Sequence, residues 1–174
     1  RRLRACDAAT GRVRWQRDTG TRGTPPSGSM VLLAGSNVVV GDEAVLAFDR
    51  TTGLPRWRFV PGDGYGAGTY LGVTVSGLVY TGSPAGRVYA IDAKTGVSRW
   101  TALVADDHQT LVFEPAADED LVVAGYGTST MPASGGIIGL DATTGAERWR
   151  TAFPRPSNAA LGSGSAGNPL LVDD

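Results

Sequence analysis

The sequence has few of the residues that build catalytic and metal sites. Its only cysteine is Cys6, so it cannot form an internal disulfide, a thiolate zinc site or a CxxC redox pair. Its only histidine is His108, and no Gly-x-Ser-x-Gly sequence is present to supply the nucleophile of a serine hydrolase. We therefore expect no catalytic residue in these 174 positions.

Long apolar runs and an excess of charge are also missing. No apolar run approaches the ~20 residues that cross a bilayer, so we expect no membrane span in this segment. The formal net charge is −1, which disfavours nucleic-acid binding because such surfaces are usually basic. Residues 1–11 lack a signal-peptide pattern. A signal peptide, a lipid anchor or a kinase domain upstream of Arg1 stays an open alternative.

What the sequence does have is one pattern repeated four times. Asp-x-x-Thr-Gly-x-x-Arg-Trp occurs at residues 7–15, 49–57, 92–100 and 141–149. The motif aspartates are 42, 43 and 49 residues apart, and periods of this size are typical of solenoids and propellers. No segment shows the apolar periodicity of a helix. The spacing and the missing helices predict an all-β protein.

Short apolar runs before each motif predict the strands. The runs directly before the motif aspartates are LRAC, VLAF, VYAI and IIGL, and most of them are apolar on both faces. This is expected for a sheet packed between two other sheets. A second set precedes three of these runs: NVVVG (37–41), LVYTG (78–82) and LVVAG (121–125). With an inner strand before them and the tryptophan strand after them, we expect units of four antiparallel strands, which are propeller blades.

Each residue of the motif has an expected structural role. The aspartate should accept hydrogen bonds from backbone amides two residues on, and the glycine should take a positive φ. The tryptophan should wedge between adjacent blades, and the arginine before it (Arg14, Arg56, Arg99 or Arg148) should lie over a neighbouring strand with its head in solvent. The motif residues are Asp7, Thr10, Gly11, Trp15, Asp49, Thr52, Gly53, Trp57, Asp92, Thr95, Gly96, Trp100, Asp141, Thr144, Gly145 and Trp149.

With the alanine two residues upstream, the pattern resembles the tryptophan-docking motif of the PQQ-like (pyrroloquinoline-quinone-type) β-propellers. The copies at 5–15, 47–57 and 90–100 match fully, whereas the copy at 139–149 has Gly139 for alanine, which should loosen that docking pocket. The resemblance covers residues 1–174 and implies a partial propeller. We expect about four blades' worth of a seven- or eight-bladed ring: three complete blades and partial blades at both ends, the last formed by GNPLLVDD (167–174).

The resemblance leaves two functions open. Outer-membrane assembly lipoproteins and the sensor domains of bacterial Ser/Thr kinases imply a non-catalytic, extracytoplasmic binding or scaffold module that needs no cofactor and recruits a protein, peptide or glycan. The alternative is part of a quinone (PQQ)-dependent alcohol or sugar dehydrogenase, which would need an acidic base beside a calcium ion held by carboxylate and amide oxygens. The disulfide between adjacent cysteines that the alcohol dehydrogenases add is excluded here. The asparagines, Asn37, Asn158 and Asn168, all sit in turn-like contexts, so we expect the first function.

One hairpin varies in length and is the candidate interaction region. From Gly41, Gly82 and Gly125 to the next motif aspartate the distance is 8, 10 and 16 residues, so the hairpin at 126–136 is lengthened. In a propeller this hairpin shares a face with the connections between blades, here 61–70 and 153–167, and such loops often bind partners. The predicted interaction residues are Tyr65, Tyr70, Tyr126, Met131 and Arg155. The alternative is that the longer hairpin is only a tolerated insertion.

Overall fold

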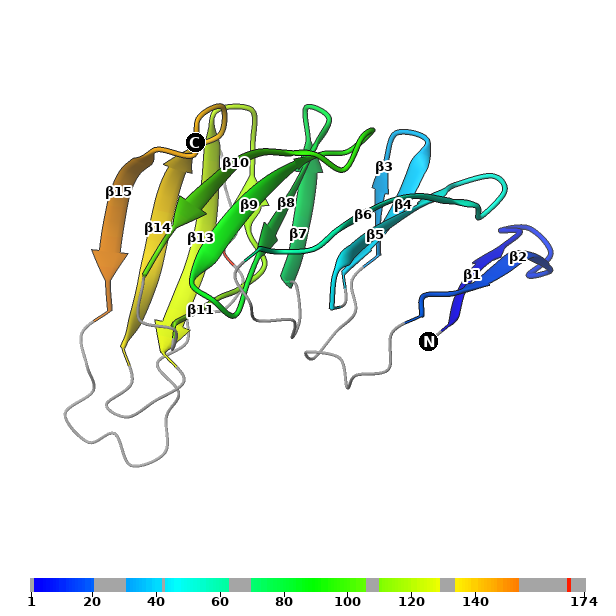
Figure 1. Ribbon diagram of the computed structural model, residues 1–174, viewed down its shortest axis with the longest axis horizontal. Helices are drawn as coiled ribbons and strands as arrows, with labels where there is room; N and C mark the ends of the chain where they lie inside the picture. The colour runs from blue at the N-terminus through cyan, green and yellow to red at the C-terminus, as the bar shows by residue number, and fades with distance from the viewer. Residues whose placement is uncertain are drawn as a thin grey trace.

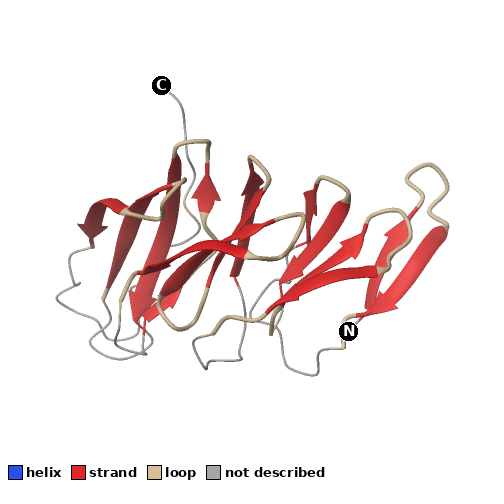
Figure 2. Ribbon diagram, turned by 45° about the horizontal axis from the view of Figure 1, so that its top comes forward, coloured by secondary structure: helices blue, strands red, loops and turns tan. Residues whose placement is uncertain are grey.

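The computed structural model describes residues 2–20, 31–41, 43–62, 70–105, 110–128, 134–153 and 169. Every regular element among these residues is a β-strand, and the strands form four antiparallel sheets. The sheets stand side by side in a row, with the N-terminal sheet at one end (Figure 1). Figure 2 shows the same row from a second direction, again built of strands joined by short turns. Within the described ranges no helix could cross a membrane.

Three of the sheets have the four-stranded meander expected of a propeller blade. The N-terminal sheet has two strands, β1 (Arg2–Cys6) and β2 (Val13–Asp18). The second contains β3 (Val31–Ala34), β4 (Asn37–Gly41), β5 (Val45–Asp49) and β6 (Pro55–Phe59). The third contains β7 (Tyr70–Val75), β8 (Leu78–Gly82), β9 (Arg87–Asp92) and β10 (Ser98–Leu103). The fourth contains β11 (Thr110–Val112), β12 (Ala116–Ala117), β13 (Leu121–Thr128), β14 (Gly135–Asp141) and β15 (Glu147–Ala152).

The inner strand of the fourth sheet is split in two. Both β11 and β12 pair with β13, and Pro115, which has no N–H to donate to a ladder, lies in the interruption between them. Pro115 also packs on the preceding sheet, because a Cβ added at Gly72 in β7 would meet its backbone. A side chain at Gly72 would therefore push the two sheets apart.

The core lies between the sheets and not within any one of them. One cluster joins the second and third sheets around Val39, Ala47, Leu71, Val79 and Ile91. A second joins the third and fourth sheets, and its members include Tyr80, Val88, Trp100, Val122 and Ile138. Burial of this apolar surface is the main favourable term that holds neighbouring sheets together.

The predicted burial of both strand faces is confirmed in the second, third and fourth sheets, where five of the seven residues of β14 are buried. Four of the five residues of β5 are buried, as are the four central residues of β9. In β1, exposed residues alternate with half-buried ones, so that prediction was wrong for the N-terminal sheet. β1 differs from the other strands because its sheet has only two strands, so within the described residues it pairs with β2 alone and has one free edge.

Antiparallel order places the connections on two opposite faces. The β3–β4 and β7–β8 turns lie on one face, visible at the top of Figure 1, and the motif turns share it because Asn37 at the start of β4 pairs with Asp49 at the end of β5. We call this the turn face. The β4–β5 and β8–β9 hairpins and the paired ends of β13 and β14 at Gly127 and Gly135 lie on the opposite face, which we call the loop face.

Candidate functional site

Each motif copy folds into the predicted aspartate-centred turn. In the second copy, Oδ1 of Asp49 accepts hydrogen bonds from the Thr52 amide at 2.7 Å and from the Thr52 hydroxyl at 2.9 Å. Gly53 donates its amide to the Asp49 carbonyl at 2.8 Å and has a φ of 69°. The same bonds recur around Asp7, Asp92 and Asp141, and the glycines there have φ values of 70°, 76° and 73°.

The sequence predicted that the motif arginines lie over neighbouring strands, and this was wrong. Each arginine instead pairs with the aspartate of its own turn. In every copy, Nη2 of the arginine lies 2.5–2.6 Å from Oδ2 of that aspartate. The cause is a β-bulge: Ser98 pairs with Ile91 and Trp100 with Ala90, so Arg99 between them has no partner residue. A bulged residue re-aims its side chain, and the carboxylate is the strongest acceptor within reach. The arginine side chains remain 43–66% exposed, as predicted.

This pairing lowers the pKa of the motif carboxyl groups. The Arg99 guanidinium, the Thr95 hydroxyl and the Thr95 amide hold the pKa of Asp92 far below its ordinary value of 3.8. The pKa values of Asp49 and Asp141 are lowered as strongly by the equivalent partners, led in each case by the arginine. The pKa of Asp7 is lowered too, with Arg14 as the largest cause.

We expect acid to destabilise the protein through these four turns. A carboxyl group with a lower pKa in the folded chain binds fewer protons there than in the unfolded chain, so its contribution to stability grows with pH. The contribution is fully present above the unfolded-state pKa of about 3.9 and is lost as the pH falls below it. Urea unfolding at a series of pH values measures this, and Asp92→Asn should flatten the decline. A free energy of unfolding that does not change on acidification would contradict the prediction.

The motif tryptophans join each sheet to the next one. Nε1 of Trp15 donates to the Arg50 carbonyl at 3.0 Å, and Nε1 of Trp57 donates to the Ala93 carbonyl at the same distance. The Trp100 indole donates to the Ala142 carbonyl at 2.9 Å. In all three cases the acceptor is the residue that follows the aspartate of the next motif. Each junction between sheets therefore uses the same hydrogen bond.

The face of each of these indoles covers the glycine of the next motif. A Cβ added at Gly53 would lie 2.6 Å from the Trp15 ring, and one added at Gly96 would lie 2.7 Å from the Trp57 ring. The corresponding distance from Gly145 to the Trp100 ring is 2.5 Å. Only glycine has room for the indole at these positions, which gives the motif glycine a second role beside its positive φ.

The fourth tryptophan, Trp149, is placed differently. It lies in β15 of the end sheet and is 41% exposed. Its ring rests on its strand partner Gly139, because a Cβ added there would meet the indole. We had expected Gly139 to loosen the docking pocket. That expectation was wrong, because the space left by the missing methyl group is filled by the ring of Trp149 itself.

The predicted interaction residues are only partly described. Tyr126 lies in β13, is half-buried, and has the Arg150 guanidinium 5.3 Å from its ring centre. Tyr70 begins β7, whereas Tyr65, Met131 and Arg155 lie outside the described residues. The grouping of these five residues stays a prediction. The sequence analysis did not identify Arg150 as a neighbour of Tyr126. The contact joins β15 to β13 across β14, and no local pattern predicts it.

The hairpin of β13 and β14 is the longest one on the loop face. Gly125 corresponds to Gly41 and Gly82, which end β4 and β8, but β13 continues for three more residues. The added pairs join Tyr126 to Gly136 and Gly127 to Gly135, and the Thr128 amide donates to the Ser134 carbonyl at 2.8 Å. The lengthened hairpin predicted from the spacing is thus in part a rigid extension of the sheet.

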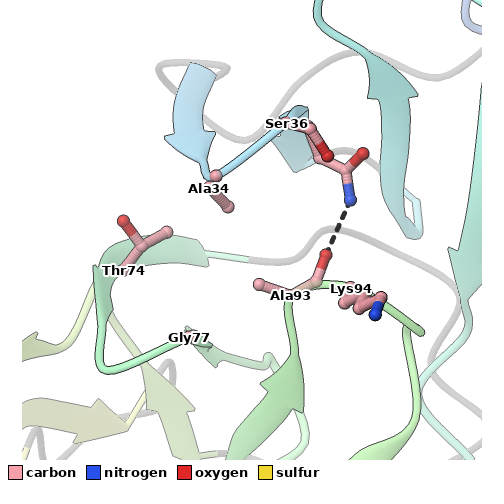
Figure 3. A pocket seen from close by; sticks show the side chains of 8 residues that line it. Ala34, Ser36, Thr74, Gly77, Ala93 and Lys94 are labelled. Atoms are coloured by element: carbon pink, nitrogen blue, oxygen red, sulfur yellow. Dashed lines mark hydrogen bonds between the residues drawn. The ribbon is translucent and has the colours of Figure 1, made fainter.

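On the turn face, two pockets lie between neighbouring sheets. The first has a volume of about 320 Å³ and is lined by residues of the β3–β4 turn, the β7–β8 turn and the third motif (Figure 3). Buried Asn37 donates Nδ2 to the Ala93 carbonyl at 2.8 Å there, the acceptor that Trp57 also uses. The second, of about 530 Å³, lies between the third and fourth sheets and shares Lys94 with the first. Asn37 therefore helps to hold a junction.

The described residues do not fit a quinone and calcium site. Such a site needs several carboxylate and amide oxygens directed at one point. Within the described ranges no group of three or more His, Cys, Asp and Glu side chains could hold a metal ion. The four motif carboxylates each pair with an arginine on a separate turn, and the Asn37 amide binds a backbone carbonyl.

Four-stranded antiparallel meanders packed face to face in a row are blades of a β-propeller, so the chain is a partial β-propeller whose blades are joined by docked tryptophans. The family model described as outer membrane protein assembly factor BamB, a PQQ-repeat model, matches residues 1–174. The chain belongs to this family.

Known relatives of the chain have several different activities. It is 33% identical over 145 residues to the quinohemoprotein alcohol dehydrogenase ADH-IIG of Pseudomonas putida, covering 76% of this chain and 20% of the dehydrogenase. It is 33% identical over 141 residues to the serine/threonine-protein kinase AfsK of Streptomyces griseus, covering 72% of this chain and 17% of the kinase. The chain thus spans about a fifth of the length of these curated relatives.

The fold is also found in a solved structure of the family. The crystal structure of BamB from Moraxella catarrhalis superposes with a TM-score of 0.53 at 18% identity, covering 86% of this chain and 58% of that one. At this identity the likeness shows the fold alone. The comparisons therefore place the chain among propellers that include enzymes and an assembly factor.

Proposed function

We propose that the chain is a non-catalytic binding or scaffold module that recruits a protein, peptide or glycan through its loop face. The observation that carries this proposal is that the residues of the turn face and those of the loop face have different roles. The motif residues are engaged in closing turns and joining sheets. The β13–β14 extension lies on the loop face instead and carries half-buried Tyr126 beside Arg150. The Arg150 guanidinium also binds Glu147 and the Val104 carbonyl. Tyrosine and arginine are enriched at protein interfaces.

The family description supports a protein partner outside the cytoplasm. It names an outer membrane protein assembly factor, and a module of that kind acts by binding other proteins. We propose a periplasmic or cell-surface location for this chain on the same ground, and we propose that it works without a cofactor. The pairing of the four motif carboxylates with arginines in their own turns supports the last point.

The second candidate is a part of a quinone-dependent alcohol or sugar dehydrogenase. The observation that favours it is the 33% identity to the quinohemoprotein alcohol dehydrogenase. In that case the residues that hold the quinone and calcium would come from outside the described part of the chain, since the described residues do not supply the donor set.

A calorimetric titration with pyrroloquinoline quinone and calcium separates the two candidates. It should be run on the protein at its full natural length, beside residues 1–174, with the Pseudomonas putida dehydrogenase as the positive control. We expect no saturable heat and no reduction of a dye by alcohols. Saturable binding with turnover would overturn the proposal and establish the dehydrogenase.

The same proteins can test the loop face directly. A photo-crosslinking amino acid replaces Tyr126 on the loop face or Val97 on the turn face, which is 63% exposed and serves as the matched control. We expect one discrete protein adduct in cells from position 126 and not from position 97. Equal adducts from both positions would count against recruitment through the loop face.

A further inference from the structure

We propose that the first pocket of the turn face binds the C-terminal carboxylate of a peptide or protein chain, with Lys94 and Asn37 as its two polar contacts. The pocket has a volume of about 320 Å³, a size found among ligand pockets. It lies between the second and third sheets, which are both complete four-stranded meanders, and all of its lining residues belong to the described part of the chain. The site is on the face opposite to the loop face, so it goes beyond the function proposed above.

Asn37 is a buried polar side chain with one hydrogen-bonding atom left over. It is 4% exposed, and its Nδ2 donates to the Ala93 carbonyl at 2.8 Å. The amide also has an acceptor oxygen, and among the described residues no donor to Oδ1 of Asn37 is found. A buried acceptor without a partner costs free energy, and buried polar atoms generally have a partner in the protein, a water molecule or a ligand. Because Asn37 lines the pocket, a molecule bound there can donate to it.

The repeat shows that the blade does not need an asparagine at this place. Asn37 begins β4 opposite the motif aspartate at the end of β5. Leucines hold the same place in the next two sheets, Leu78 in β8 and Leu121 in β13, again opposite motif aspartates. A leucine is therefore sufficient to start this strand. The asparagine gives the first pocket a polar group that the second pocket lacks at the corresponding place, where Leu78 lines it.

Lys94 gives the pocket a positive charge. It is the only charged residue that lines the first pocket and the only lysine of the sequence. Its side chain is exposed, and no carboxylate within the described ranges pairs with its ammonium group. Lys94 also borders the second pocket, but Asp92 and Glu119 line that pocket and disfavour an anion there. The first pocket is therefore the one that suits an anionic group.

The remaining walls leave room for the end of a polypeptide. They are formed by small residues: Ala34, Gly35, Ser36, Thr74, Gly77 and Ala93. Figure 3 shows Lys94 next to Ala93, with Ser36 across the pocket from them. Ser36 and Gly77 are exposed, so the rest of a bound chain can leave toward solvent.

A chain end matches both polar contacts at once. Its carboxylate accepts from the Lys94 ammonium, which is a charge-assisted hydrogen bond. The amide N–H of its last residue, a few bonds away, donates to Oδ1 of Asn37. Capture of a C-terminal carboxylate is a recurring mode of peptide recognition. An internal peptide segment has the N–H but no backbone carboxylate, so the charge of Lys94 favours the chain end.

Fluorescence anisotropy with short peptides tests the site on the protein at its full natural length. The probes are tripeptides Ala-Ala-X with fluorescein on the amino end, in which X is each of the genetically encoded residues in turn. We expect at least one free-acid peptide to bind saturably. Its C-terminal amide, which keeps the N–H and loses the charge, should bind at least tenfold more weakly. Equal binding of acid and amide, or no saturable binding by any of the peptides, would overturn the proposal.

Two substitutions taken from the repeat itself assign the contacts. Lys94→Thr introduces the residue that two other motifs have at this position, Thr51 and Thr143. Asn37→Leu introduces the leucine of the other two blades. Each should raise the dissociation constant at least tenfold, whereas Lys94→Arg should retain most of the binding.

The control is Arg58→Thr, which removes an exposed cation of β6 outside the pocket and should leave binding unchanged. Circular dichroism confirms that every variant is folded. If neither Lys94→Thr nor Asn37→Leu weakened binding, the peptides would bind elsewhere and the assignment of this pocket would be wrong.

Discussion

Trp100→Ala is expected to lower the free energy of unfolding by about 3–5 kcal/mol, the range for removing a large aromatic side chain from a core. Trp100 is 9% exposed between the third and fourth sheets, and its ring centre lies 5.9 Å from that of Tyr80. Its removal leaves a cavity and takes the 2.9 Å hydrogen bond away from the Ala142 carbonyl. Urea unfolding followed by far-ultraviolet circular dichroism measures the loss.

Trp149→Ala is the matched control, because it removes the same side chain from the same motif position. With Trp149 at 41% exposure, we expect a loss of no more than about 1 kcal/mol, close to the range of ordinary surface substitutions. The comparison is made at a protein concentration low enough for both variants to be monomeric. Equal losses for the two tryptophans would show that docking between sheets is not what holds this protein together.

The second large effect is expected from Gly96→Ala. The substitution places a residue with a side chain at a φ of 76°, which costs about 1–2 kcal/mol. It also puts a methyl group 2.7 Å from the Trp57 ring, and forcing extra volume into a packed site typically costs about 1–3 kcal/mol more. We expect a total loss of about 2–5 kcal/mol by the same urea measurement.

Gly11→Ala isolates the part of this loss that comes from docking. Gly11 has nearly the same φ of 70°, but within the described residues it has no indole over it. Its substitution should therefore cost only the conformational strain of about 1–2 kcal/mol. If Gly11→Ala and Gly96→Ala were equally destabilising, the indole over Gly96 would contribute nothing measurable.

The architecture could be predicted from the sequence because its signals are local and repeated. The period, the apolar runs and the Asp-x-x-Thr-Gly turns each lie within a few residues, and the turn bonds to Asp49 and Asp92 involve only the two or three following residues. Four copies in register also remove most of the ambiguity of a single short motif. The strand order within each complete blade followed directly.

The features that were missed depend on register and on distant strands. The arginines were misplaced because a bulge that leaves Arg99 unpaired arises from the pairing of β9 with β10, which no local pattern encodes. The close approach of Pro115 to Gly72 was missed as well, because these residues lie in different sheets. The loop face is harder still, because its chemistry depends on side chains from several connections, such as Arg150 beside Tyr126.

Because the three junctions use the same contacts, such a protein can gain or lose blades through evolution. Each blade carries both halves of the joint, an indole for the blade ahead and a turn for the blade behind. Unequal recombination between repeats in the gene would therefore delete or duplicate a blade and leave a new joint identical to the old ones. The number of blades and the assortment of loops can then vary without any redesign of interfaces, which makes one ancestral module sufficient for a family with diverse activities.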